Sequence, residues 1–252
     1  MRTEEPRAIN LKDYRAPDYR ISEIALDFRL EPETTRVTAT SKMTRTGSGP
    51  LVLDGEQLKL VSVKVDGKPA EHKADEATLT ISGLPEKFTL EIVTEISPVN
   101  NTALEGLYVA KGIFCTQCEA EGFRRITYFL DRPDVLAVYT TRIEADKASY
   151  PTLLSNGNLT SHGDLAGGKH FAVWNDPFPK PCYLFALVAG DLGSIHDTFT
   201  TMSGRKVDLR IFVEHGNEQK AAYAMDSLKR AMKWDEEAYG REYDLDIFMI
   251  VA

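Results

Sequence analysis

Short stretches in which apolar and polar residues alternate fill the chain from residue 19 to about residue 188. Alternation with a period of two places apolar side chains on one face of a β-strand and polar side chains on the other. Turn residues separate the stretches, and no helical repeat runs through them. We therefore predict half-buried strands in RISEIALDFRL, TRVTATSKM, LKLVSVKV, ATLTIS, FTLEIVTEIS, AVYTTRIEA, KHFAVWND and YLFALVAGD.

Two dipeptides predict tight connections between these strands. Asp66-Gly67 and Asn156-Gly157 are typical of two-residue hairpin turns. Strands joined by such turns run antiparallel, so the pattern predicts a large, mainly antiparallel β domain. Two irregular segments interrupt it, SPVNNTALEGLY at 97–108 and NDPFPKP at 175–181. The second suits a rigid loop, because each proline fixes its own φ.

A helical repeat appears at about 218–239. Its apolar residues recur every three to seven positions, in steps that keep them on one face, at Ala221, Met225, Leu228, Met232 and Tyr239. That spacing predicts one helix whose apolar stripe faces a core. We expect Asn217 to act as its N-cap and Gly240 to supply a left-handed C-terminal stop.

Further strands flank this helix. TFTTMSGRKVDLRIFVEHG, at 198–216, reads as a hairpin-like pair, and LDIFMIVA, at 245–252, is apolar enough for a strand buried on both faces. The sequence stops inside that strand. Because unpaired backbone groups of a buried strand must reach a partner or solvent, we expect the sequence to be a fragment of a longer protein.

Composition and charge exclude several classes of protein. The 252 residues are 42% hydrophobic and 27% charged, which suits a soluble protein with a sizeable core. Neither a signal peptide nor a run of ~18 apolar residues is present, so we expect a cytoplasmic protein with no membrane insertion. The net charge is −8, and no Lys/Arg tract is present. Nucleic acid and anionic membranes are therefore poor partners.

The spacing of the three cysteines does not indicate a disulfide framework, a zinc site or a redox dithiol. An odd number without a secretory signal argues against a disulfide framework. Cys115 and Cys118 form one C-x-x-C, but a structural zinc site needs a second such pair or a pair of spaced histidines. A redox dithiol would follow a strand and open a helix, and the flanking residues do not predict that arrangement.

Four long segments resemble bacterial aminopeptidase N, a family of gluzincin zinc metallopeptidases. They are NTALEGLY, CTQCEAEGFRRITYFLDRPDV, PFPKPCYLFALVAGD and MKWDEEAYGREYDLDIFMIVA, and the resemblance runs over residues 14–252. It implies a mainly β chain, with a saddle-like antiparallel β-sandwich domain over 1–191. The start of an α+β thermolysin-like catalytic domain would follow over 192–252.

The resemblance implies that the full-length protein releases single amino acids from peptides with a free N-terminus. Such enzymes use Zn²⁺ to activate a water, and the glutamate of H-E-x-x-H acts as general base. Neither H-E-x-x-H nor the family's G-A-M-E-N motif occurs in this sequence. We therefore expect both beyond Ala252, with no zinc, no metal ligand and no catalytic residue in this fragment. Its partners would be the remaining catalytic and C-terminal domains of the same protein.

The segment TQCEA resembles the family's T-Q-x-E/Q-A segment, which projects into the active site. The resemblance implies that Gln117 and Glu119 contact the substrate's N-terminal residue, with Glu119 close to its α-amine. The cysteines are then neighbours of the site. Taken from the residues alone, EAE is an ordinary pair of solvated acids.

For other polar residues of this region, the sequence is compatible with a structural role. The triplet at 131–133, Asp-Arg-Pro, resembles a D-E-P triplet of the family with Arg in place of Glu, and it suits a turn or an ion pair. Glu121, Arg124 and Arg125 suit either the cleft or an ordinary surface. A non-catalytic β-sandwich binding module, with Gln117 and Glu119 as incidental surface groups, is the alternative function.

Overall fold

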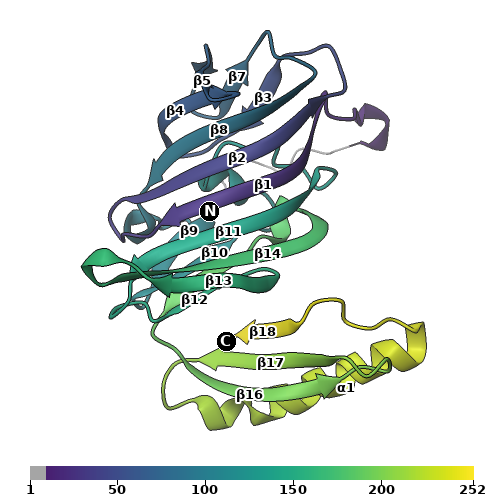
Figure 1. Cartoon of the computed structure of the whole chain (residues 1–252). Coiled ribbons are helices and arrows are strands. Elements are labelled where there is room, and N and C mark those ends of the chain that lie inside the picture. The colour runs from purple at the N-terminus through teal and green to yellow at the C-terminus, as the bar shows by residue number, and fades with distance from the viewer. Residues whose placement is uncertain (1–9) are drawn as a thin grey trace.

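Six of the predicted alternating strands and two further strands, at Lys68–Pro69 and Asn158–Asp164, assemble into one large sheet. Figure 1 shows this sheet. The computed structural model describes residues 10–252, so residues 1–9 of the predicted first domain lie outside the described residues. The sheet contains β1 (Tyr19–Arg29), β2 (Thr35–Arg45), β4 (Lys59–Val65), β5 (Lys68–Pro69), β8 (Lys87–Ile96), β11 (Leu136–Asp146), β13 (Asn158–Asp164) and β14 (Lys169–Pro181). Their order is β13-β14-β11-β1-β2-β8-β4-β5. Neighbours run antiparallel except β1 and β11, which are parallel, and the mainly β fold class is confirmed.

The period-two pattern determines which face of this sheet is buried. In β1 the side chains of Ile24, Leu26 and Phe28 are buried, whereas those of Glu23 and Ala25 are exposed. Burial of one apolar face against other layers supplies the main driving force for assembling such a sheet.

Two smaller sheets pack on the same core. One has the order β12-β15-β10-β9, formed by Thr152–Ser155, Leu187–Gly190, Ile113–Gln117 and Gly106–Ala110. The other has the order β3-β7-β6, formed by Leu51–Asp54, Thr78–Ile81 and Lys73–Ala74. Apolar residues of all three sheets share one hydrophobic cluster. The remaining short elements here are 3-10 turns at Leu11–Asp13, Pro98–Asn100, Phe123–Arg125, Ala166–Gly168 and Cys182–Leu184.

A separate small sheet with one helix forms the last part of the described chain (Figure 1). The sheet has the order β16-β17-β18, at Gly193–Thr200, Lys206–Val213 and Ile247–Val251. The helix α1 spans Ala222–Tyr239 and follows a 3-10 turn at Glu218–Ala221. Its residues Met225, Leu228 and Met232 pack with β17 in a second hydrophobic cluster that also contains Ala221, which confirms the predicted apolar stripe at these four positions. The prediction was wrong for Tyr239, which is 65% exposed because it lies at the last residue of the helix, where its ring packs against that of Trp234. None of the helices found in residues 10–252 has the length and apolar character that crossing a bilayer requires.

Of the two end residues predicted for the helix, Gly240 is confirmed and Asn217 is not. Gly240 adopts the left-handed conformation, with φ 61°, and its N–H donates to the carbonyl of Glu236 over 3.0 Å, as predicted. The prediction that Asn217 caps the helix through its side chain was wrong. Its Oδ1 accepts instead from Nζ of Lys220, over 2.7 Å, because a 3-10 turn separates Asn217 from the α-helix.

One predicted connection is confirmed and two differ from the sequence prediction. Asp66-Gly67 joins β4 to β5 as a hairpin, with positive φ at both residues. Asn156-Gly157 instead joins β12 to β13, which lie in different sheets. Asn156 lacks the positive φ of such a hairpin, and its side chain is bonded to Leu184 and Ala186. Part of the segment 97–108, predicted as irregular, forms the start of β9.

The proline-rich stretch and the final strand also differ from expectation. Residues 175–181 continue β14 rather than forming a loop, and the register shifts between Ala137 and Tyr139 of β11. Such an irregularity accommodates prolines, which donate no ladder hydrogen bond. The strand β18 is only half-buried, with Val251 42% exposed, because β17 is its single strand neighbour in the described chain.

Candidate functional site

The two residues that the resemblance selects lie at the end of β10 and in the loop that follows it. We call residues 117–122 the site loop. The side chains of Gln117, Glu119 and Glu121 are exposed, whereas Cys118 is 3% exposed and Gly122 is buried. The loop therefore presents its polar side chains to solvent and is attached to the core through Cys118 and Gly122.

The site loop is closed by two internal hydrogen bonds. The N–H of Gly122 donates to the carbonyl oxygen of Cys118 over 2.9 Å, and Nε2 of Gln117 donates to the carbonyl oxygen of Glu119 over 3.1 Å. The peptide bond between Glu119 and Ala120 is cis. The structure thus brings Gln117 and Glu119 together through a side-chain to backbone contact.

Neither of the hydrogen bonds that close the site loop involves the carboxylate of Glu119. It makes no hydrogen bond or ion pair with any of residues 10–252, and the side-chain oxygen of Gln117 accepts none within the same range. Two hydrogen-bond acceptors, one of them charged, therefore belong to residues two positions apart on one closed loop. Such a pair can bind a cationic donor group.

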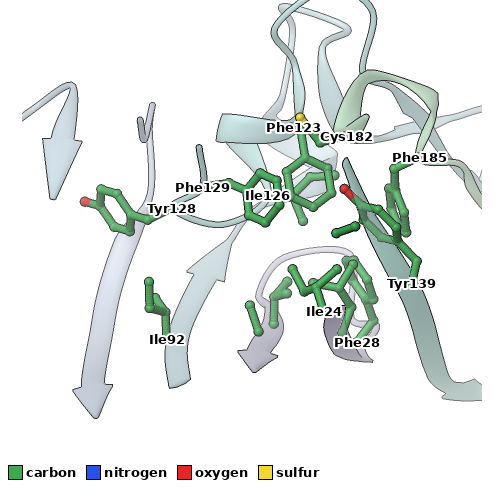
Figure 2. Close-up of a cluster of buried hydrophobic side chains, with 14 of the residues drawn as sticks. Ile24, Phe28, Ile92, Phe123, Ile126, Tyr128, Phe129, Tyr139, Cys182 and Phe185 are labelled. Atoms are coloured by element: carbon green, nitrogen blue, oxygen red, sulfur yellow. The ribbon is translucent and has the colours of Figure 1, made fainter. Parts of the chain in front are cut away.

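An aromatic cluster fixes the chain immediately after the site loop. Phe123 is fully buried, and its ring centroid lies 4.9 Å from that of Phe129, 5.4 Å from Phe185 and 6.3 Å from Tyr139. Figure 2 shows these four rings among the apolar side chains of the core. Aromatic pairs at these separations add to the free energy of burial, so the turn Phe123–Arg125 is held in one position.

Arg124 is the centre of a group of carboxylates beside the loop. Its Nε lies 2.9 Å from Asp131 Oδ2, its Nη1 lies 3.7 Å from Glu121 Oε2, and its Nη2 lies 4.0 Å from Asp54 Oδ2. Burial alone would lower the pKa of Arg124, but these three carboxylates outweigh it and the pKa is raised. Burial raises the pKa of the Asp54 carboxyl, and Arg124 opposes that shift.

Arg125 and Arg132 also form ion pairs. Arg125 is paired with Glu56 and Glu105, and its side chain is 11% exposed. That burial excludes the reading of Arg125 as an ordinary surface residue. Nη2 of Arg132 lies 2.7 Å from Oδ2 of Asp134, which confirms the ion pair that the triplet at 131–133 suggested.

The cysteines belong to the interior. All three are free thiols, Cys118 and Cys182 are buried, and Cys115 is half-buried. Burial raises the pKa of each thiol, well above its ordinary value for Cys118 and Cys182. Because the thiolate is the reactive and metal-binding form, this setting opposes redox chemistry and metal binding at neutral pH.

Asp131 is a buried residue whose part in the site was missed from the sequence. It is 4% exposed, and its carboxylate accepts hydrogen bonds from Arg124 and from Sγ of Cys182, the latter over 3.1 Å. Cys182 lies 51 positions further along the chain, so no local spacing could have indicated this contact. The resemblance of the Asp-Arg-Pro triplet at 131–133 to a triplet of the family was the available signal.

The described chain does not fit a catalytic zinc ion. Such a site needs three converging protein ligands and an open position for water. Among residues 10–252, no three His, Cys, Asp or Glu side chains lie together in a way that could hold a metal ion.

Residues 17–184 match the family described as the peptidase M1 N-terminal domain. The chain is 59% identical to aminopeptidase N of Escherichia coli (strain K12), over 99% of this chain and 29% of the relative. It is 60% identical to aminopeptidase N of Caulobacter vibrioides, over 100% of this chain and 30% of the relative. The chain thus spans about 30% of the length of these curated relatives.

A solved structure agrees with the sequence relatives. The structure of Legionella pneumophila aminopeptidase A in complex with aspartic acid superimposes with a TM-score of 0.91 and 36% identity. The match covers 96% of this chain and 29% of that one.

Proposed function

This chain belongs to the peptidase M1 family, and from that membership we propose that it forms the N-terminal part of a zinc aminopeptidase. The whole protein would release single amino acids from peptides with a free N-terminus. Identity of 59–60% to two aminopeptidases N, over nearly all of the present chain, supports this proposal. The zinc ligands would lie in the rest of the protein, together with the remaining catalytic and C-terminal domains.

In this proposal residues 1–191 form the saddle-like domain and residues 192–252 begin the catalytic domain. Two observations support that division. The strand β15 ends at Gly190 and β16 begins a different sheet at Gly193. Most of the buried residues on either side of that point belong to separate hydrophobic clusters.

We assign the anchoring of the substrate's α-ammonium group to Glu119, with Gln117 as its neighbour. An ammonium group has three N–H donors, and the Glu119 carboxylate and the Gln117 side-chain oxygen are two acceptors without a partner in residues 10–252. Charge-assisted hydrogen bonds of this kind are roughly twice as strong as neutral ones. The carboxylate would therefore supply most of the binding and the amide would supply orientation.

The anchor would also explain selectivity for free N-termini. An acylated or internal peptide bears no cation at this position, so binding it would leave the Glu119 carboxylate desolvated and unpaired. A closed loop serves this purpose well, because it keeps the carboxylate in place before the substrate arrives. The observation that carries the proposal is the Glu119 carboxylate, which has no partner in residues 10–252, on a loop held by buried residues.

We further propose that the protein works in the cytoplasm. The three cysteines are all free, as is usual in a reducing compartment.

The proposed reaction is tested with the full-length protein that contains this chain. A peptide with a free N-terminus and its N-acetylated counterpart are incubated separately, and the released amino acids are identified. We expect one N-terminal residue at a time from the free peptide only, with loss of activity after dialysis against a chelator and recovery with Zn²⁺. Binding without any release would contradict the enzyme and favour the binding module, and equal cleavage of both peptides would contradict the amine anchor.

A further inference from the structure

We infer that Asp131 is a positioning residue for the site loop, and that it sets the place of Glu119 without touching a substrate itself. This inference rests on the proposed function, because it gives Asp131 an effect on activity only through the Glu119 anchor. Its basis is a set of contacts that runs from the buried carboxylate of Asp131 to the loop.

The carboxylate of Asp131 accepts three hydrogen bonds. Oδ2 accepts from the backbone N of Arg124 over 3.1 Å and from its Nε over 2.9 Å, and Oδ1 accepts from Sγ of Cys182 over 3.1 Å. The carbonyl oxygen of Asp131 also accepts from Nη2 of Arg124, over 3.3 Å. With its side chain 1% exposed, this carboxylate depends on these donors, since a buried charge without partners is strongly disfavoured.

Asp131 is itself fixed to a neighbouring strand. Its backbone N donates to Oδ2 of Asp54 over 3.3 Å. Asp54 and Phe129 exchange two backbone hydrogen bonds, of 2.8 and 3.0 Å, at an isolated bridge. Asp131 therefore belongs to the rigid part of the core, and Arg124 is bound to that part.

Backbone hydrogen bonds continue the connection into the site loop. The residue after Arg124, Arg125, donates its N–H to the carbonyl of Gly122 over 3.0 Å. Gly122 in turn donates to the carbonyl of Cys118 over 2.9 Å. A shift of Arg124 would thus be transmitted to both ends of the segment that carries Glu119.

The side chain of Arg124 makes a second connection. Its Nη1 lies 3.7 Å from Glu121, two residues after Glu119, while its Nε remains bound to Asp131. The loop is consequently held from its backbone and from one side chain by the same Arg124–Asp131 pair. A displacement of a substrate-positioning group by about 1 Å can cost ~100-fold in rate, so a positioning effect of this size is measurable.

The test compares Asp131→Asn with Asp134→Asn in the full-length enzyme. Asn keeps the shape of Asp131 and one acceptor oxygen but removes the charge that holds Arg124. We expect kcat/KM for a free-amine substrate to fall by about 10- to 100-fold. Asp134 is the matched control, because it is also paired with an arginine but does not contact the site loop. Its variant should stay within about threefold of the parent.

A double-mutant cycle separates an effect on the position of Glu119 from a loss of activity that does not depend on Glu119. In a Glu119→Ala background the anchor is already lost, so adding Asp131→Asn should change kcat/KM by less than about threefold. A further loss equal to that of the single variant would overturn this inference alone. Full activity of Glu119→Ala by itself would overturn the proposed anchor instead.

Arg124→Lys keeps the inference testable if Asp131→Asn does not fold. It retains the charge and the backbone N–H but not the Nε contact, so we expect a smaller loss, of about three- to tenfold, that also vanishes in the Glu119→Ala background. A loss that persists undiminished in that background would contradict the positioning role.

Discussion

The backbone nitrogen of Gly122 lies 2.9 Å from the carbonyl oxygen of Cys118, and this hydrogen bond closes the loop that carries Glu119. A side-chain carbon on Gly122 would lie 2.9 Å from the backbone N of Gly106 and 3.1 Å from Cα of Cys118. With φ −79° the backbone of Gly122 is one that any residue adopts. Space, rather than backbone conformation, therefore requires glycine here.

We predict that Gly122→Ala moves the site loop. The added carbon must displace backbone atoms, which costs roughly 1–3 kcal/mol of stability, and kcat/KM of the full-length enzyme should fall by about tenfold or more. Gly67→Ala is the control: Gly67 has φ 78° but open space around a Cβ, and it lies in a distant hairpin. That variant should lose about 1 kcal/mol of stability through strain alone, with kcat/KM unchanged. Parent-like kcat/KM for Gly122→Ala would contradict the close packing of the loop.

The thiols give a second prediction, measured by labelling with a thiol-specific reagent. Only Cys115 should react at an appreciable rate in the native protein, because Cys118 and Cys182 are buried and burial raises their pKa values. All three should react after unfolding. Cys115→Ser should retain kcat/KM within about threefold, since no step of the proposed function uses a thiol. Rapid native labelling of all three cysteines, or a crippled Cys115→Ser enzyme, would restore a chemical role for the C-x-x-C pair.

A third prediction concerns pH and the connection between the two parts of the chain. Nε2 of His215 lies 2.8 Å from Oδ1 of Asp191, which lies between β15 and β16. The hydrogen bond and charge of Asp191 raise the pKa of His215, with a further contribution from Glu218. The stabilisation from this pair is therefore fully present below the unfolded pKa, about 6.5, and is lost as pH rises through the folded pKa.

Titration of the His215 ring protons by NMR tests that shift. We expect a pKa above the ordinary histidine value in the parent chain and a lower pKa in Asp191→Asn. An identical pKa in the two proteins would show that the contact between His215 and Asp191 does not form in solution.

Much of the fold could be predicted from local patterns. The alternation in β1 correctly places Ile24, Leu26 and Phe28 on the buried face. The partner of each strand could not be predicted in this way, because pairing depends on contacts between distant segments. Asn156-Gly157 has the residues of a hairpin, yet its two strands join different sheets, since Asn156 is bonded to a third segment.

The candidate site was less predictable from local patterns than the fold. Gln117 and Glu119 were selected by family resemblance, and their residue types alone describe an ordinary exposed loop. The buried support of that loop could not be read from the sequence, because Asp131 meets Arg124 seven positions earlier and Cys182 51 positions later. The tertiary structure alone determines that the Asp131 carboxylate is buried and which donors surround it.

Replacement of Glu119 by alanine in the full-length enzyme tests the central claim most directly. Removing one partner of a desolvated charge pair costs roughly 2–5 kcal/mol, so kcat/KM should fall by about thirty- to several-thousand-fold at ~1.4 kcal/mol per decade. Gln117→Ala should lose less, because a neutral hydrogen bond contributes less than a charged one.

The measurement is kcat/KM of parent and Glu119→Ala on one aminoacyl substrate with a free α-amine, with bound zinc quantified in both. The amine anchor predicts the large fall in kcat/KM with unchanged zinc content. A Glu119→Ala enzyme with full zinc content and kcat/KM within about threefold of the parent would contradict it.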